Sequence, residues 1–128
     1  MVGIEIDMVV RDCIAALDFY EKIFDIEIVE KTSHARGSNE AVFNMYGTRF
    51  HLLDENQQFA LLAPQPGQPH NMWVNVLVSD VRKIYANAMA LGCTELSPIA
   101  EIPEFGVVRA IFMDTFGYPW MLHEIQNR

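Results

Sequence analysis

The sequence describes the same structural unit twice. An apolar stretch ending in Val-Arg-Asp at residues 10–12 leads into an amphipathic segment, and Val-Ser-Asp at residues 78–80 leads into another. Each copy closes with apolar runs around a glycine, Gly47 in the first and Gly117 in the second. The period is too long and the copies are too few for a solenoid, so the pattern predicts a duplicated β-α-β-β-β unit.

Hydrophobic periodicity predicts the elements of each copy. The first copy has the pattern of strands at 4–10, 26–31, 41–46 and 49–54, a helix at 13–24 and a polar, mobile loop at 32–40. The second has the pattern of strands at 72–78, 93–96, 107–113 and 118–125, a helix at 81–91 and a proline-containing loop at 97–106. Asp12 and Asp80 are suited to cap the helices, because a carboxylate accepts hydrogen bonds from the free N–H groups of a first turn.

Length and charge limit what the chain can be. Its 128 residues suit one domain with a real core. We expect two modules in that domain, at 1–62 and 72–128, joined by a proline-rich linker at 63–71. The net charge is -8 and no cluster of lysine and arginine occurs, which argues against nucleic acid or an anionic membrane as a partner.

Cysteine usage and hydropathy indicate the compartment. Cys13 and Cys93 are the only cysteines, and their spacing matches neither a disulfide framework nor a metal-binding motif. No apolar run approaches the ~20 residues that cross a bilayer, and no signal peptide is recognisable. We therefore expect a cytoplasmic protein whose two thiols are small buried side chains.

Two motifs resemble a known family. The first is Val-x-Asp-x-x-x-Ala-x-x-Phe-Tyr, which starts at Val10 and ends at Tyr20, and the second is Asp-Thr-Phe-Gly-Tyr-Pro-Trp at residues 114–120. In this order, around a duplicated unit, they resemble the vicinal oxygen chelate superfamily. That superfamily includes glyoxalase I, bleomycin-resistance proteins, fosfomycin-resistance enzymes and extradiol dioxygenases. The Phe-Gly and Trp of the second motif are most similar to the PhnB-like branch.

The resemblance implies an α+β fold in which two βαβββ modules form a curved mixed sheet around a cup, usually in a homodimer. In the metal-using members, four positions on the first and last strands of the modules line this cup. Their equivalents here are Glu5, His51, Trp73 and Met121. Since neither an indole nor a thioether suits a hard or borderline divalent ion, the resemblance predicts a cup with no resident metal. If a metal does bind, Glu5 and His51 are its expected ligands.

Strand alternation identifies the residues of the cup independently. If Gly47-Thr48 is a two-residue turn, Asn44 lies opposite His51 and Tyr46 opposite Arg49, while Ile4 and Ile6 point into the core. The residues expected to line the cup and bind a ligand are Glu5, Asp7, Asn44, His51, Trp73, Asn75, Met121 and His123. Asp7 and His123 are offset from the family positions by nearly 7 Å, at ~3.3 Å per residue, which disfavours them as substitute metal ligands.

Three functions remain open, and the sequence assigns no catalytic residue. The first is a metal-independent protein that binds a small, amphipathic and cationic molecule by stacking on Trp73 and pairing with Glu5 or Asp7. The second is a metal-dependent lyase, isomerase or dioxygenase that uses Glu5 and His51. The third is a degenerate scaffold whose cup is filled by Trp73 and Met121. Each candidate side chain also has an ordinary structural reading, as a core aromatic, a hydrogen-bonded histidine or a solvated carboxylate.

Overall fold

The computed structural model describes residues 1–126 and contains two compact units. The first unit is Met1–Pro64, and the second begins at Gln65. Each unit holds one βαβββ module, so the duplication predicted from the sequence is confirmed. No helix within the described residues is both long enough and apolar enough to span a membrane.

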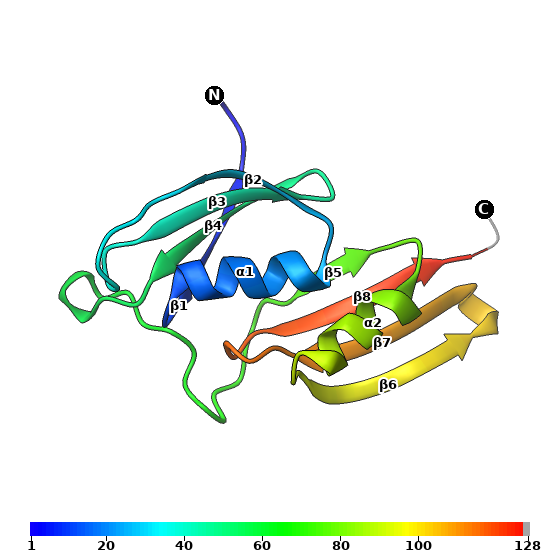
Figure 1. The fold of residues 1–128 in the computed structure, drawn as a ribbon. Coiled ribbons are helices and arrows are strands. Elements are labelled where there is room, and N and C mark those ends of the chain that lie inside the picture. The colour runs from blue at the N-terminus through cyan, green and yellow to red at the C-terminus, as the bar shows by residue number, and fades with distance from the viewer. Residues whose placement is uncertain (127–128) are drawn as a thin grey trace. The chain divides into compact units, whose positions relative to one another are not determined.

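The first unit is a four-stranded sheet with one helix across it (Figure 1). Strand β1 at its edge is parallel to β4, and the β4-β3-β2 part is antiparallel, which gives the order β1-β4-β3-β2. The elements are β1 (Glu5–Val10), α1 (Cys13–Ile23), β2 (Ile26–Lys31), β3 (Glu40–Met45), β4 (Thr48–Asp54) and the short 3-10 helix η1 (Gln57–Phe59).

The second unit repeats this plan with the order β5-β8-β7-β6. Strand β5 is parallel to β8, and the other neighbours are antiparallel. The elements are β5 (Val74–Leu77), α2 (Val81–Ala90), β6 (Thr94–Ile102), the 3-10 helix η2 (Pro103–Phe105), β7 (Val107–Met113) and β8 (Pro119–Ile125). The α+β class expected from the sequence is therefore confirmed.

In each unit the helix covers one face of the sheet, and the core lies between them. Phe43 and Phe50 are paired across β3 and β4, are both buried, and stack with ring centroids 5.2 Å apart. Leu17 and Tyr20 from α1 are buried in the same unit. Burying side chains of this size contributes about 1.5–3 kcal/mol each. The opposite face of each sheet is left without a helix of its own unit, and we call it the open face.

Carboxylates hold the start of both helices. Asp12 accepts from the backbone N–H of Ala15, and Asp80 does the same for Lys83, so both predicted caps are confirmed. A second carboxylate, from the end of the last strand of each unit, takes the first N–H of the helix. Asp54 accepts from Cys13 at 2.7 Å and Glu124 from Val81 at 3.0 Å. These contacts join elements far apart in the chain, and local patterns did not reveal them.

Three sequence-based expectations about element ends are wrong. The first part of the predicted loop at 97–106 is strand, because β6 continues to Ile102. The pairing of β6 with β7 is irregular at two places, and β6 is an edge strand, so Pro98 can be accommodated although it has no N–H to donate. Ile4 and Met72 were expected to begin strands, and Ile4 to point into the core, but they are 88% and 90% exposed. Both precede the first paired residue of their strands, so no neighbouring strand or helix covers them.

The first hairpin turns one residue earlier than expected. Met45 pairs with Thr48, so the two-residue turn is Tyr46-Gly47, with φ values of 48° and 85°. Positive φ at both positions is the mark of a type I′ turn. Asn44 therefore lies opposite Arg49, not opposite His51 as predicted. The pairing moves by two residues in all, so the division of side chains between the two faces is unchanged.

The segment between β2 and β3 was expected to be a mobile loop, but many hydrogen bonds hold it. Asp54 accepts from the N–H groups of Gly37 and Asn39, at 2.8 and 2.9 Å. The Asn39 side chain accepts from His34 N–H at 2.7 Å and donates to the carbonyl of the same residue at 2.9 Å. The backbone of this loop is thus tied to the end of β4.

Candidate functional site

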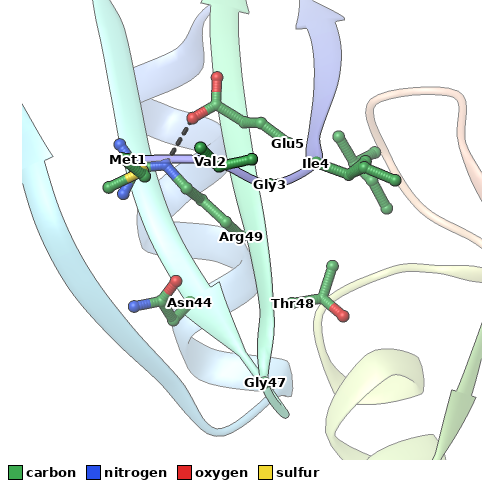
Figure 2. A pocket seen from close by; sticks show the side chains of 10 residues that line it. Met1, Val2, Gly3, Ile4, Glu5, Asn44, Gly47, Thr48 and Arg49 are labelled. Atoms are coloured by element: carbon green, nitrogen blue, oxygen red, sulfur yellow. Dashed lines mark hydrogen bonds and ion pairs between the residues drawn. The ribbon is translucent and has the colours of Figure 1, made fainter.

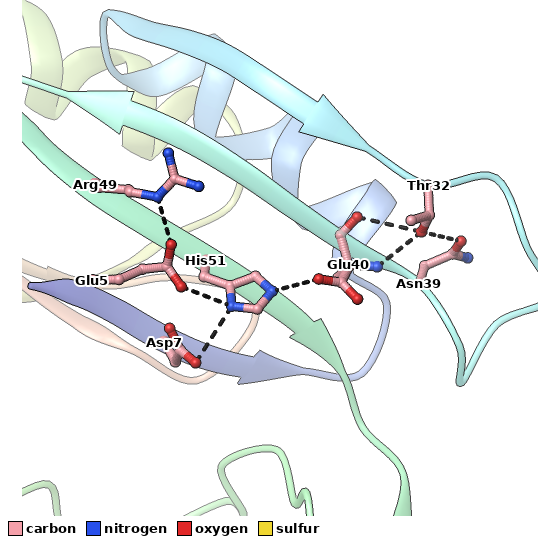
Figure 3. Close-up of polar contacts among 7 residues, drawn as sticks. All are labelled: Glu5, Asp7, Thr32, Asn39, Glu40, Arg49 and His51. Carbon is pink, nitrogen blue, oxygen red and sulfur yellow. Dashed lines mark hydrogen bonds and ion pairs between the residues drawn. The ribbon is translucent and has the colours of Figure 1, made fainter. Parts of the chain in front are cut away.

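Parallel pairing of β1 and β4 brings four polar side chains together on the open face of the first unit. Glu5 lies beside Arg49, and Asp7 lies beside His51 (Figure 3). Alternation along β4 sends Phe50 and Leu52 to the buried side, so Arg49 and His51 share the other face. Glu40, the first residue of β3, reaches the same group. We call Glu5, Asp7, Glu40, Arg49 and His51 the acidic cluster.

His51 is the centre of the acidic cluster. Its Nδ1 lies 3.1 Å from Glu5 Oε1 and 3.4 Å from Asp7 Oδ2, and its Nε2 lies 3.0 Å from Glu40 Oε1. The imidazole is mostly covered, whereas the carboxylates of Asp7 and Glu40 are about half exposed (50% and 52%). Both ring nitrogens therefore face carboxylates on the same open surface.

Arg49 fixes the orientation of the Glu5 carboxylate. Its Nε donates to Glu5 Oε2 at 2.5 Å, which leaves Oε1 directed at His51. The hydrogen bond from Arg49, together with the nearby His51, holds the pKa of the Glu5 carboxyl below its usual value. Glu5 is thus kept ionised and points one oxygen at the ring.

The acidic cluster is short of positive charge. A neutral imidazole carries one proton, so in either tautomer one ring nitrogen turns a lone pair toward a carboxylate oxygen. Three carboxylates and one guanidinium leave a formal charge of -2 when His51 is neutral. A second proton on His51, or a bound cation, removes this repulsion.

The donor atoms around His51 Nδ1 suit a divalent metal. Ligating atoms of Glu5, Asp7 and His51 all lie within 4.8 Å of one another, the only such group among residues 1–126. Neighbouring ligands on an octahedral ion, with bonds of about 2.1 Å, are about 3 Å apart, close to the two Nδ1–oxygen distances. The expectation that Asp7 lies too far along the strand to join Glu5 is wrong, because both side chains bend toward the same ring nitrogen.

A pocket of about 530 Å³ adjoins the acidic cluster (Figure 2). The segment before β1 and the β3–β4 hairpin form its sides, and Glu5 and Arg49 lie within it. Asn44, a predicted ligand-lining residue, is also part of this pocket and donates weakly to Glu27 at 3.4 Å. Thus three of the predicted first-unit residues meet at the acidic cluster, and the fourth lines the adjoining pocket.

The predicted residues of the second unit lie on β5, on β8 and in the segment before β5. His123 Nδ1 and Asn75 Oδ1 are 2.6 Å apart, and Met121 pairs in register with Asn75. Burial lowers the pKa of His123, and the nearby Arg109 lowers it further. Trp73 precedes β5, is 44% exposed, and donates from its indole to the carbonyl of His70 at 3.0 Å. None of these contacts of the second unit involves a carboxylate.

Sequence reasoning missed Glu40 and gave no role to Arg49. Glu40 was placed at the end of a polar loop, yet it is the first residue of β3 and has the same parity as Asn44. Extending the predicted strand by one residue would have placed Glu40 on the candidate face. Arg49 was placed on the correct face, but its bond to Glu5 depends on the parallel register of β1 and β4.

The glyoxalase/bleomycin resistance protein/dioxygenase superfamily model matches residues 4–122 of the chain. No curated protein matches it in sequence. Solved structures are similar throughout their length. TioX from Micromonospora sp. ML1 is 18% identical with a TM-score of 0.70, covering 99% of this chain and 98% of TioX. A PhnB protein from Bacillus cereus is 18% identical with a TM-score of 0.72, covering 96% and 99%.

The fosfomycin resistance protein FosX from Listeria monocytogenes is also similar. Its E126Q mutant, complexed with Mn(II) and 1S,2S-dihydroxypropylphosphonic acid, is 17% identical to this chain, with a TM-score of 0.71. The alignment covers 96% of this chain and 90% of FosX. At these identities the solved structures establish the shared fold alone.

Proposed function

The chain belongs to the glyoxalase/bleomycin resistance protein/dioxygenase superfamily, and from that premise we propose that it is a divalent-metal-dependent member acting on a small molecule. Glu5, Asp7 and His51 are the proposed metal ligands. The observation that carries the proposal is the position of His51 Nδ1, which lies 3.1 and 3.4 Å from two carboxylate oxygens. A divalent cation there would convert mutual repulsion into attraction and neutralise the formal charge of -2.

The remaining residues of the acidic cluster support this assignment. Histidines that bind metals commonly donate their second ring N–H to a carboxylate, and Glu40 is in that position beside Nε2. Ligating carboxylates are likewise hydrogen-bonded, as Glu5 is to Arg49. When bound, a divalent ion would act as a Lewis acid that stabilises an oxyanion or enolate. Arg49 and Glu40 orient the ligands, and the adjoining pocket offers space for a substrate.

A second candidate function is metal-free binding of a cationic, amphipathic molecule, which was the first hypothesis from the sequence. Protonation of His51 would also relieve the repulsion within the acidic cluster. The half-exposed carboxylates of Asp7 and Glu40 favour this candidate, because they remain open to a ligand cation. Trp73 would be its stacking surface, as predicted from the sequence.

The deciding experiment measures metal content and metal binding in protein purified without chelators or a metal-affinity tag. We expect near-stoichiometric metal, and a rise in melting temperature of several degrees with Mn(II), Zn(II) or Fe(II) at 100-fold excess over Kd. His51→Ala should abolish both, and Asp7→Asn should weaken them. His34→Ala is the matched control, because His34 lies in the loop between β2 and β3, beside a groove at α1 and outside the acidic cluster.

Retention of full metal occupancy by His51→Ala would refute this site. If wild type shows no metal and no shift, 9-aminoacridine tests the metal-free candidate, and acridine, largely uncharged at pH 7.5, serves as its matched neutral control. Selective binding of the cation, lost in Asp7→Asn, would establish that second function. Equal binding of both dyes would contradict it.

The proposal also includes the cellular location and the assembly of the protein. We propose a cytoplasmic protein, consistent with Cys13 and Cys93, which are both buried free thiols. We also propose that both modules act as one domain in a homodimer, as is common in the superfamily. Size-exclusion chromatography with light scattering measures the assembly directly.

A further inference from the structure

The first unit has a second concave surface that shares no residue with the acidic cluster. It is a groove of about 720 Å³ formed by α1, β2 and the loop between β2 and β3. Ile14 and Leu17 from α1 and Ile28 from β2 supply its apolar lining. A concave surface of this size that combines apolar side chains with polar groups is a common form of small-molecule site.

Basic side chains line one part of this groove. Lys31, His34 and Arg36 occur within six residues of a chain that has a net charge of -8. Within residues 1–126, none of these three side chains forms an ion pair. Basic groups left unpaired in so acidic a protein, beside apolar side chains, indicate affinity for an anion.

The acidic side chains of the groove are mostly engaged elsewhere. Asp12 caps α1 through the N–H of Ala15, and Asp18 pairs with Lys22 at 2.9 Å. Glu21 is the remaining acidic residue of the lining. These contacts do not remove the charge of Asp12, but all three carboxylates lie on α1 or at its cap, whereas the lining residues within 28–39 include none. The positive side of the groove is therefore the side formed by β2 and the loop, with Lys31 and Arg36.

The loop that carries His34 and Arg36 is held in place before any ligand binds. Asp54 is buried and takes the N–H groups of Gly37 and Asn39, and Asn39 bonds both the N–H and the carbonyl of His34. Fixing a loop in advance lowers the conformational entropy lost on binding. The basic residues are thus presented on a preorganised support.

We propose that this groove binds an amphipathic organic anion. Its apolar body would lie on Ile14 and Ile28, and its carboxylate or sulfonate would pair with Lys31 and Arg36. An inorganic anion lacks the apolar body, and a neutral apolar molecule leaves the basic groups unpaired. The proposal is independent of the metal site, because the two sets of residues do not overlap.

The test is a titration of 15N-labelled protein with naphthalene-2-carboxylate, followed by amide chemical shifts. We expect saturable shifts confined to α1 and residues 28–39. Naphthalene-2-methanol, its neutral counterpart, and acetate, which lacks the ring, should each bind at least tenfold more weakly. The double variant Lys31→Gln/Arg36→Gln should lose at least tenfold in affinity, whereas Lys83→Gln, on α2, which contributes nothing to the groove, should not.

Several outcomes would overturn the proposal. These are no saturable shifts at millimolar probe, shifts centred elsewhere, or equal affinity for the neutral alcohol. Unchanged affinity in the double variant, with a spectrum that shows the native fold, would do the same. His51→Ala should leave this titration unaltered, so the result is read separately from that of the metal experiment.

Discussion

The two modules have the same topology but different side chains on their open faces. Both have the same strand order, a helix over one face, an aspartate cap and a carboxylate from the last strand on the first helical N–H. Their open faces differ. The first carries Glu5, Asp7 and His51, whereas the second carries Asn75, Met121 and His123. Contacts that support the helix recur after duplication, while the side chains free to meet a ligand have diverged.

The largest expected effect tests whether each module relies on one buried carboxylate. Asp54 accepts three backbone N–H bonds, and Asp114 accepts two such bonds and the indole N–H of Trp120. Alanine at either position leaves buried donors without a partner, at about 1–3 kcal/mol each. We expect Asp54→Ala and Asp114→Ala each to lose about 3 kcal/mol or more in urea unfolding.

Asparagine at either position is the matched control, because it keeps one oxygen acceptor and should cost less than alanine. A loss below about 1 kcal/mol in Asp54→Ala would mean that water replaces the carboxylate. The two modules would then differ in their scaffold as well as in their open faces.

A smaller effect tests whether metal binding depends on the carboxylate beside His51 in the first module, and not on the overall charge of the protein. Glu40→Gln keeps the shape of the side chain but removes the charge that faces His51 Nε2. We expect Mn(II) affinity to fall about tenfold by calorimetry. Glu101→Gln, on the other module, removes an exposed partner of Arg82 and should change nothing. An equal loss of Mn(II) affinity in the two variants would mean that the overall negative charge, and not the position of Glu40, determines the affinity.

Loss of the helix cap should lower the free energy of unfolding by the same amount in both modules, because the two modules have the same cap. Asp12→Ala and Asp80→Ala each remove a carboxylate 3.1 Å from a first-turn N–H. We expect about 1 kcal/mol in each case, measured by chemical denaturation. A clear inequality would show that Asp54 and Glu124, which bond the same helix ends, compensate to different degrees.

The smallest effect depends on pH and concerns the second module. Burial and Arg109 keep the pKa of His123 below its usual value, so the unfolded chain binds this proton more readily than the folded protein. Stability should therefore decline as the pH falls below about 6.5. His123→Gln should flatten this part of the stability curve. An unaltered slope in His123→Gln would contradict this assignment.

Periodicity and capping chemistry determined most of the scaffold from the sequence. The alternation in residues 41–54 placed Asn44, Arg49 and His51 on one face of the hairpin, and in the structure these residues lie opposite the face that buries Phe43 and Phe50. That agreement survived an incorrect turn, because the register error was an even number of residues. The end of β6 was not predicted, since a proline and two irregularities disguise its strand pattern.

The acidic cluster depended on tertiary structure. Glu5 and Asp7 meet His51 only because β1 lies parallel to β4, a pairing between residues more than 40 positions apart. No local pattern specifies which strands become neighbours or how side chains bend to share one ring nitrogen. The sequence by itself determined the modules, their helices and the sides of their strands, because these follow from short-range periodicity. Tertiary structure decided which polar side chains contact one another, because charge and hydrogen bonding act through space between residues far apart in the sequence.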